Sequence, residues 1–168
     1  MTFSWKDIER IKTYCDLPII IKGIATREDA ILAVECGVEV IYVSNHGGRQ
    51  LDFGLGGLKV LPEIVDAVGE DATIFFDGGI MRGTDVVKAL SLGANIVGIG
   101  RLQGLAAAAG GSAAIYRMLE LLELEIITCM RLLGVNGISE LNSTFLTKDE
   151  SFGSLDVLSA FPLINEGY

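Results

Sequence analysis

Apolar residues fall along the chain in four short runs that show no polar alternation. Each run holds four or five mainly aliphatic or aromatic residues and leads into a glycine, a small polar residue or an aspartate. Such runs are typical of strands with both faces buried in a parallel sheet. They predict strands at residues 19–23, 40–44, 73–76 and 95–99.

The segments between these runs have helical periodicity with recognisable starts and ends. Ser4, followed three residues later by Asp7, is expected to begin the first helix, and Thr26 is expected to cap the second. Strands that alternate with helices form a parallel sheet covered by helices, so the fold class is α/β. The predicted helices cover about residues 4–15, 26–37, 58–68, 84–92 and 112–133, with a short helix from Ser139.

No linker divides the chain. We therefore expect one domain at residues 1–146, followed by a polar, irregular C-terminal tail at residues 147–168. With 168 residues the chain can bury one sizeable core, but it is well short of a complete βα barrel. Four parallel strands could form half of such a barrel or part of a doubly wound sheet, and hydrophobic periodicity does not decide between the two.

Charge and cysteine content narrow the possible functions. A net charge of −9 argues against nucleic acid or an anionic membrane surface as a partner. The three cysteines are far apart, which predicts neither a disulfide framework nor a metal site. The sequence shows no signal segment and no apolar run of membrane-spanning length, so we expect a cytoplasmic protein.

His46 is the only histidine, and it lies just beyond the second predicted strand. An imidazole can take up a proton near neutral pH, and the guanidinium of Arg49 can hold a carboxylate by two parallel hydrogen bonds. A base beside a carboxylate clamp suits the oxidation of a 2-hydroxy acid. A purely structural role for His46 is equally compatible with these residues taken alone.

Other candidate residues also follow predicted strands. Lys22 ends an otherwise apolar strand, where it either points into a site or extends into solvent at the rim. Two glycine-containing turns, Asp77-Gly78-Gly79 and Gly100-Arg101, follow the last two strands. Glycine lets backbone amides approach a ligand closely, and the start of a following helix favours an anion. With Arg82 and Arg101 nearby, these turns predict a phosphate site.

The segment at residues 44–52, which reads SNHGGRQLD, resembles the active-site signature of the FMN-dependent α-hydroxy-acid oxidases and dehydrogenases. This family includes glycolate oxidase, lactate oxidase and mandelate dehydrogenase. The similarity extends to PIIIKGI at 18–24, DGGIMRGTDV at 77–86 and GIGR at 98–101, in the family's order. It implies a parallel (β/α) half-barrel that corresponds to strands five to eight of a TIM barrel, with a C-terminal helical extension.

The resemblance also implies FMN as the cofactor, no metal, and roles for individual residues. His46 would be the catalytic base that removes a proton from a small 2-hydroxy acid, and Arg49 would bind the substrate carboxylate. Lys22 would stabilise the reduced flavin, and Ser44 would contact it. The ribityl phosphate would be held by Asp77, Gly78, Gly79, Arg82, Gly100 and Arg101.

Three departures from the family pattern bear on these expectations. Many members have two consecutive arginines where this chain has Met81 and Arg82. Residues 101–105 form a segment about two residues shorter than the family's commoner loop. The chain also lacks the first half of the barrel, which normally supplies flavin contacts, a substrate-binding tyrosine and an aspartate that orients the histidine.

We therefore expect an oxidoreductase of which this chain is one part, completed by an N-terminal half-barrel or by a second copy of the chain. Two alternatives stay open at this point. The half-barrel could bind FMN or phosphate without catalysing a reaction. It could also be a structural unit that self-associates through its unpaired strand edges and uses no ligand.

Overall fold

Four parallel strands form one sheet in the order β1-β2-β3-β4. The computed structural model describes residues 3–148, so all of the tail predicted at residues 147–168 except residues 147 and 148 lies outside the described part of the chain. Each predicted strand is confirmed to within one residue at either end. The strands are β1 (Ile20–Ile24), β2 (Val40–Val43), β3 (Thr73–Asp77) and β4 (Ile96–Gly98).

Helices alternate with these strands, as the periodicity predicts. At the start of the first helix the Ser4 amide donates to Asp7 Oδ2 at 2.8 Å, and at the second the Asp29 amide donates to Thr26 Oγ1 at 3.2 Å. Both predicted caps are thus confirmed. The helices are α1 (Trp5–Lys12), α2 (Arg27–Glu35), α3 (Gly57–Val68), α4 (Gly83–Ser91) and α5 (Arg101–Leu133), with short 3-10 turns at His46–Gly48, Ile138–Glu140 and Ser143–Phe145.

Two helices differ from their predicted bounds by three residues or more, and the others by one or two residues. Helix α1 ends at Lys12, three residues before the expected end, and the amide and hydroxyl of Thr13 donate to the Arg10 carbonyl at 3.1 and 2.7 Å. Helix α5 begins at Arg101 instead of residue 112, because the alanine-rich stretch before residue 110 is itself helical. The backbone leaves the helical region at Gly110 and Gly111, so α5 consists of two segments.

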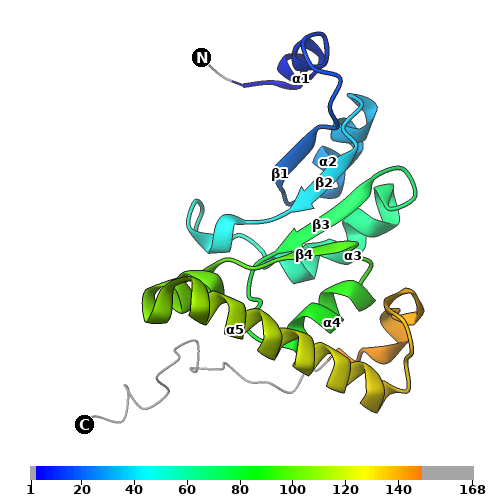
Figure 1. The fold of residues 1–168 in the computed structure, drawn as a ribbon. Coiled ribbons are helices and arrows are strands. Elements are labelled where there is room, and N and C mark those ends of the chain that lie inside the picture. Colours follow the sequence, from blue (N-terminus) through cyan, green and yellow to red (C-terminus); the bar gives the residue numbers. More distant parts are fainter. Residues whose placement is uncertain (1–2, 149–168) are drawn as a thin grey trace.

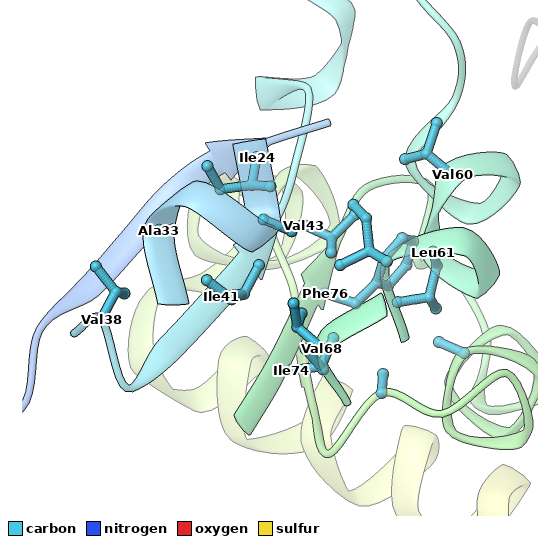
Figure 2. Close-up of a cluster of buried hydrophobic side chains, with 14 of the residues drawn as sticks. Ile24, Ala33, Val38, Ile41, Val43, Val60, Leu61, Val68, Ile74 and Phe76 are labelled. Atoms are coloured by element: carbon cyan, nitrogen blue, oxygen red, sulfur yellow. The ribbon is translucent and has the colours of Figure 1, made fainter. Parts of the chain in front are cut away.

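The hydrophobic core lies between one face of the sheet and the helices beside it. Figure 2 shows side chains of the strands, among them Ile41 and Phe76, pointing toward side chains of α3 such as Leu61. These three residues are fully buried. In the two central strands every second residue is buried on this face, which fixes the direction of the alternate residues.

The opposite face of the sheet is not covered by helices within residues 3–148. Ile20 on β1 and Ile96 on β4 are 51% and 49% exposed, although both belong to strands that read as buried on both sides. Lys22, Tyr42 and Phe75 share this face through the strand register. Because β1 and β4 are also the edges of the sheet, this face and both edges are left open to a further layer of protein.

The carboxyl ends of the strands meet at one edge of the fold. In Figure 1 the chain leaves β2 and β4 on the left, where the turn after β2 and the first turn of α5 lie close together. Parallel strands necessarily bring the segments that follow them to the same end of a sheet. Within the described residues, no helix has both the length and the apolar composition to cross a membrane.

Candidate functional site

A pocket of about 430 Å³ opens at the carboxyl ends of the strands. The strand-end position of the candidate residues predicted that they would meet here, and the structure brings eight of them together. Met81, Gly47 and Ile80 complete the lining. The eight predicted residues in the wall are Lys22, His46, Arg49, Asp77, Gly78, Gly79, Gly100 and Arg101.

A hydrogen-bonded group of three side chains joins the ends of β1, β2 and β3. Lys22 Nζ donates to Ser44 Oγ at 2.7 Å and to Asp77 Oδ2 at 2.6 Å, and the Ser44 hydroxyl donates to Asp77 Oδ1. Ser44 is only 2% exposed, so its hydroxyl forms the buried base of the group. Lys22 is therefore held at the pocket and does not extend freely into solvent.

The charge of Asp77 is stabilised by this arrangement. Partial burial raises the pKa of the Asp77 carboxyl, but the hydrogen bonds from Lys22 and Ser44 outweigh that effect and hold the pKa below its usual value. Asp77 was expected among the residues that contact phosphate, and the structure places its carboxylate on Lys22 instead. A carboxylate and a phosphate repel each other, so the lysine is the more compatible partner.

Tyr42 is a part of this site that sequence reasoning missed. Lys22 Nζ lies 4.5 Å from the centre of the Tyr42 ring, a cation–π contact. A Cβ built on Gly98 would lie 2.3 Å from the Tyr42 hydroxyl, so only glycine leaves room for the phenol. Burial and then the nearby Asp77 charge raise the pKa of Tyr42, which keeps the phenol neutral. Period-two alternation from Ser44 could have placed Tyr42 on this face.

His46 lies in a tight turn directly after β2. Its φ of 54° is in the left-handed region, and Gly47 and Gly48 follow with φ of 68° and 71°. The His46 amide donates to Ser44 Oγ at 3.1 Å, and the Gly48 amide donates to Asn45 Oδ1 at 3.1 Å. The turn exposes the His46 side chain to the pocket, where an imidazole can exchange protons with a bound molecule.

Arg49 follows this turn and is exposed in the pocket wall. The ion pairs among residues 3–148 do not include it, whereas Lys22 and Arg82 each have a carboxylate partner. Its guanidinium is thus free to bind a carboxylate from outside the chain. The structure places this group beside His46, as the spacing of the two residues predicts.

The glycine turns after β3 and β4 face open space. A Cβ built on Gly79 or Gly100 would meet no atom within 4 Å, and Gly78 and Gly79 have φ of 113° and 75°. Helix α5 begins directly after Gly100, so its first amides and the Arg101 side chain lie at the same place. Open backbone, a helix start and a guanidinium together fit the phosphate end of FMN.

Arg82, expected at the phosphate, is not brought into this pocket. Its Nε and Nη2 donate to Glu125 Oε1 at 2.8 and 2.6 Å, and the Gly83 amide donates to Glu125 Oε2 at 2.7 Å. The Arg82 amide donates to Asp85 Oδ2 at 3.0 Å. Two carboxylates of the chain therefore already occupy the start of α4, and the start of α5 is the end that can take an external anion.

The departures at residues 81 and 101–105 also have clear positions. Met81 lines the pocket at a position where many members of the family that the sequence resembles carry an arginine. The wall therefore has a thioether there in place of a cation. The shortened segment 101–105 forms the first turn of α5 and is not a loop. Arg101 is consequently the only arginine among the lining residues contributed by the turns after β3 and β4.

Comparisons with known proteins agree on one family. The protein-family model described as FMN-dependent dehydrogenase matches residues 1–148 of this chain. An L-lactate oxidase from Nostoc sp. is 46% identical over 145 residues, which cover 85% of this chain and 39% of the oxidase. A peroxisomal (S)-2-hydroxyacid oxidase from Arabidopsis thaliana is 44% identical over 155 residues, which cover 92% of this chain and 43% of that oxidase.

Solved structures support the fold assignment. A mutant flavocytochrome b2 with pyruvate bound matches with a TM-score of 0.85 and 41% identity, over 99% of this chain and 44% of that chain. The structural neighbours are TIM-barrel flavoenzymes, which confirms the α/β fold class and the half-barrel interpretation over the doubly wound sheet. The chain spans less than half the length of the curated relatives it matches.

Proposed function

The chain belongs to the FMN-dependent dehydrogenase family, and from this premise we propose that it supplies one half of an enzyme that oxidises a 2-hydroxy acid to a 2-oxo acid. One observation carries the proposal: a base, a free carboxylate-binding guanidinium, a fixed lysine and two open glycine turns line the same pocket. A 2-hydroxy acid presents the matching groups, a carboxylate and an adjacent CH–OH group that loses two electrons and two protons when it is oxidised to a carbonyl.

The residues that would hold FMN are divided between two ends of the pocket. Gly78, Gly79, Gly100 and Arg101, with the first amides of α5, would bind the phosphate. Lys22 and Ser44 would lie at the ring, where the ammonium favours a negative charge. When bound, FMN supplies an acceptor for the two electrons that leave the substrate. Arg82 would instead hold α4 against α5 through Glu125.

The chain's own residues account for the remaining steps. Arg49 binds the substrate carboxylate and thereby orients the carbon that is oxidised. Oxidation of the substrate CH–OH group releases two electrons and two hydrogens: His46 would take one hydrogen as a proton, and the other would be carried with the electron pair to FMN. The position of His46 in the turn keeps it within the same pocket. Asp77 and Ser44 hold the Lys22 ammonium in place throughout.

The substrate class is supported by two relatives, an L-lactate oxidase and an (S)-2-hydroxyacid oxidase. We propose a small 2-hydroxy acid of the S configuration for this chain. The open face and edges of the sheet would be completed by an N-terminal half-barrel, or by a second copy of the chain. A cytoplasmic location stays a prediction, since the Arabidopsis relative is peroxisomal.

Joining the chain to a complementary half tests the proposal. Residues 1–168 are fused behind the N-terminal half of the Nostoc L-lactate oxidase, and the intact oxidase serves as the control. We expect a yellow protein whose flavin band bleaches when L-lactate is added without oxygen. Colour without bleaching would support a binding module that does not catalyse, and a colourless fusion would contradict a flavin site altogether.

A substitution at Met81 tests where the phosphate binds. Met81→Arg in the chain should lower the Kd for FMN by about 10- to 150-fold, because one added charge-assisted hydrogen bond to phosphate contributes roughly 1.5–3 kcal/mol. Quenching of flavin fluorescence measures this affinity. Riboflavin, which lacks the phosphate, should gain nothing, and Met81→Leu should change neither affinity. An equal gain for riboflavin would place the phosphate elsewhere.

A further inference from the structure

The turn that carries His46 is connected to the start of α5 by the side chain of Arg101. Arg101 Nη2 donates to the Gly47 carbonyl oxygen at 2.8 Å. A Cβ built on Gly47 would lie 2.8 Å from Nη1 and 2.9 Å from Nη2, so the guanidinium packs directly against the Gly47 backbone. A hydrogen bond and a close contact thus join residues that are far apart in the sequence.

This turn has an uncommon backbone conformation. His46, Gly47 and Gly48 all have positive φ, a region that a histidine seldom adopts. The His46 amide donates to Ser44 Oγ and the Gly48 amide donates to Asn45 Oδ1, and both acceptors directly precede the turn in the sequence. Within residues 3–148, the bond from Arg101 is the one hydrogen bond to residues 46–48 that comes from another part of the fold.

Arg101 also belongs to the anion end of the pocket. It lines the wall together with the glycine turns after β3 and β4. A guanidinium has five N–H donors, and the Gly47 carbonyl takes one of those of Arg101. The remaining donors are available to an anion. An anion bound there and the His46 turn would therefore share one side chain.

We propose that Arg101 is a positioning residue that fixes the His46 turn and couples anion binding at the glycine turns to the position of the imidazole. The coupling rests on the proposed function, in which the anion is the phosphate of FMN; the fixing of the turn does not. Coupling between two sites is reciprocal, so a molecule that orders His46 also strengthens anion binding by the same factor.

Amide hydrogen exchange of the 168-residue chain tests the fixing of the turn without any ligand. Arg101→Leu keeps a residue with good helix propensity and removes the donors. We expect the amides of His46 and Gly48 to exchange about tenfold faster in this variant, while the amides of Ile41 and Ile74 in the core keep their rates. Arg117→Leu is the matched control, since Arg117 also lies on α5 but pairs with Glu120.

Exchange at His46 and Gly48 that stays at the wild-type rate in Arg101→Leu would overturn the positioning role. Faster exchange throughout the core as well would also contradict it, because the effect would then be a general loss of stability. Only a local increase, absent from the Arg117 control, supports the proposal.

Titration with inorganic phosphate tests the coupling. His46 is the only histidine, so the NMR spectrum contains a single set of imidazole signals, which needs no assignment against others. In the wild-type chain we expect this signal and the amide signals of Gly79 and Gly100 to move with the same half-saturation. In Arg101→Lys, which keeps a positive charge, the amide signals should still move and the imidazole response should fall by about fivefold or more.

An imidazole response that Arg101→Lys leaves unchanged would refute the coupling. So would a wild-type chain in which phosphate moves the glycine amides but not His46. The proposed function has its own test in FMN binding and bleaching of the fused barrel, so a failure there is separate from a failure of the Arg101 link.

Discussion

Alanine in place of His46 should slow flavin reduction by a 2-hydroxy acid about 10²- to 10⁴-fold in the completed barrel, the range that a general base contributes. The affinity for FMN should stay within about twofold, because the substitution leaves the Gly47 carbonyl that Arg101 contacts in place and the residues proposed to bind the phosphate lie on other turns. Anaerobic stopped-flow measurement of flavin bleaching gives the rate, and fluorescence quenching gives the affinity.

Two controls separate loss of the base from damage to the turn. Gln50→Ala alters an exposed neighbour that does not line the pocket, and it should leave the rate unchanged. Added imidazole should restore part of the rate to His46→Ala, since a free base can enter the vacated space. A variant that reduces its flavin at the normal rate would remove His46 from the chemistry.

Lysine in place of Arg49 should raise KM for the 2-hydroxy acid by about 30-fold, equivalent to roughly 2 kcal/mol. A lysine keeps the charge but cannot form the two parallel hydrogen bonds of a guanidinium to a carboxylate. Arg49 has no ion-pair partner among residues 3–148, so the substitution breaks no internal salt bridge. Steady-state kinetics of the completed barrel measure KM and kcat separately.

A substrate analogue makes this second prediction specific. In the amide of the same 2-hydroxy acid the carboxylate is replaced by an uncharged group. The wild-type protein should strongly prefer the acid, and Arg49→Lys should lose most of that preference. If the variant and the wild-type protein prefer the acid to the same degree, Arg49 does not bind the carboxylate.

The strand and turn positions could be predicted from the sequence because their signals are local. A run such as residues 73–76 is short, apolar and bounded by turn residues, and it forms β3 within one residue of its predicted end. The meeting of the candidate residues at the strand ends could also be predicted, because it follows from the sheet type. Once the sheet is parallel, its geometry brings them to one edge.

The partners of these side chains could not be predicted in the same way. Arg82 was expected at the phosphate, but Glu125 comes close to it only when α4 packs on α5. Asp77 was likewise expected there, and its pairing with Lys22 spans the three strands from β1 to β3. Each partner depends on long-range packing, about which the residues beside Arg82 and Asp77 carry no information.

Coverage of the sheet shows a related limit. The apolar runs predict burial of both faces, yet Ile20 and Ile96 remain half exposed in the described part of the chain. Burial of both faces fits the completed barrel that we propose, in which a further half-barrel would cover this face. Local periodicity therefore predicts the type of strand but does not identify the layer that covers each face.

Gly110 and Gly111 divide α5 into two segments with different surroundings. Residues 112–133 are clamped to α4, where a Cβ on Gly83 would lie 2.5 Å from Glu125 Cβ. Residues 101–109 carry Arg101 at the pocket. Rotation about the backbone of Gly110 and Gly111 is the least costly way to change the direction of residues 101–109 relative to residues 112–133. A movement that reorients Arg101 then need not disturb the packing of α4.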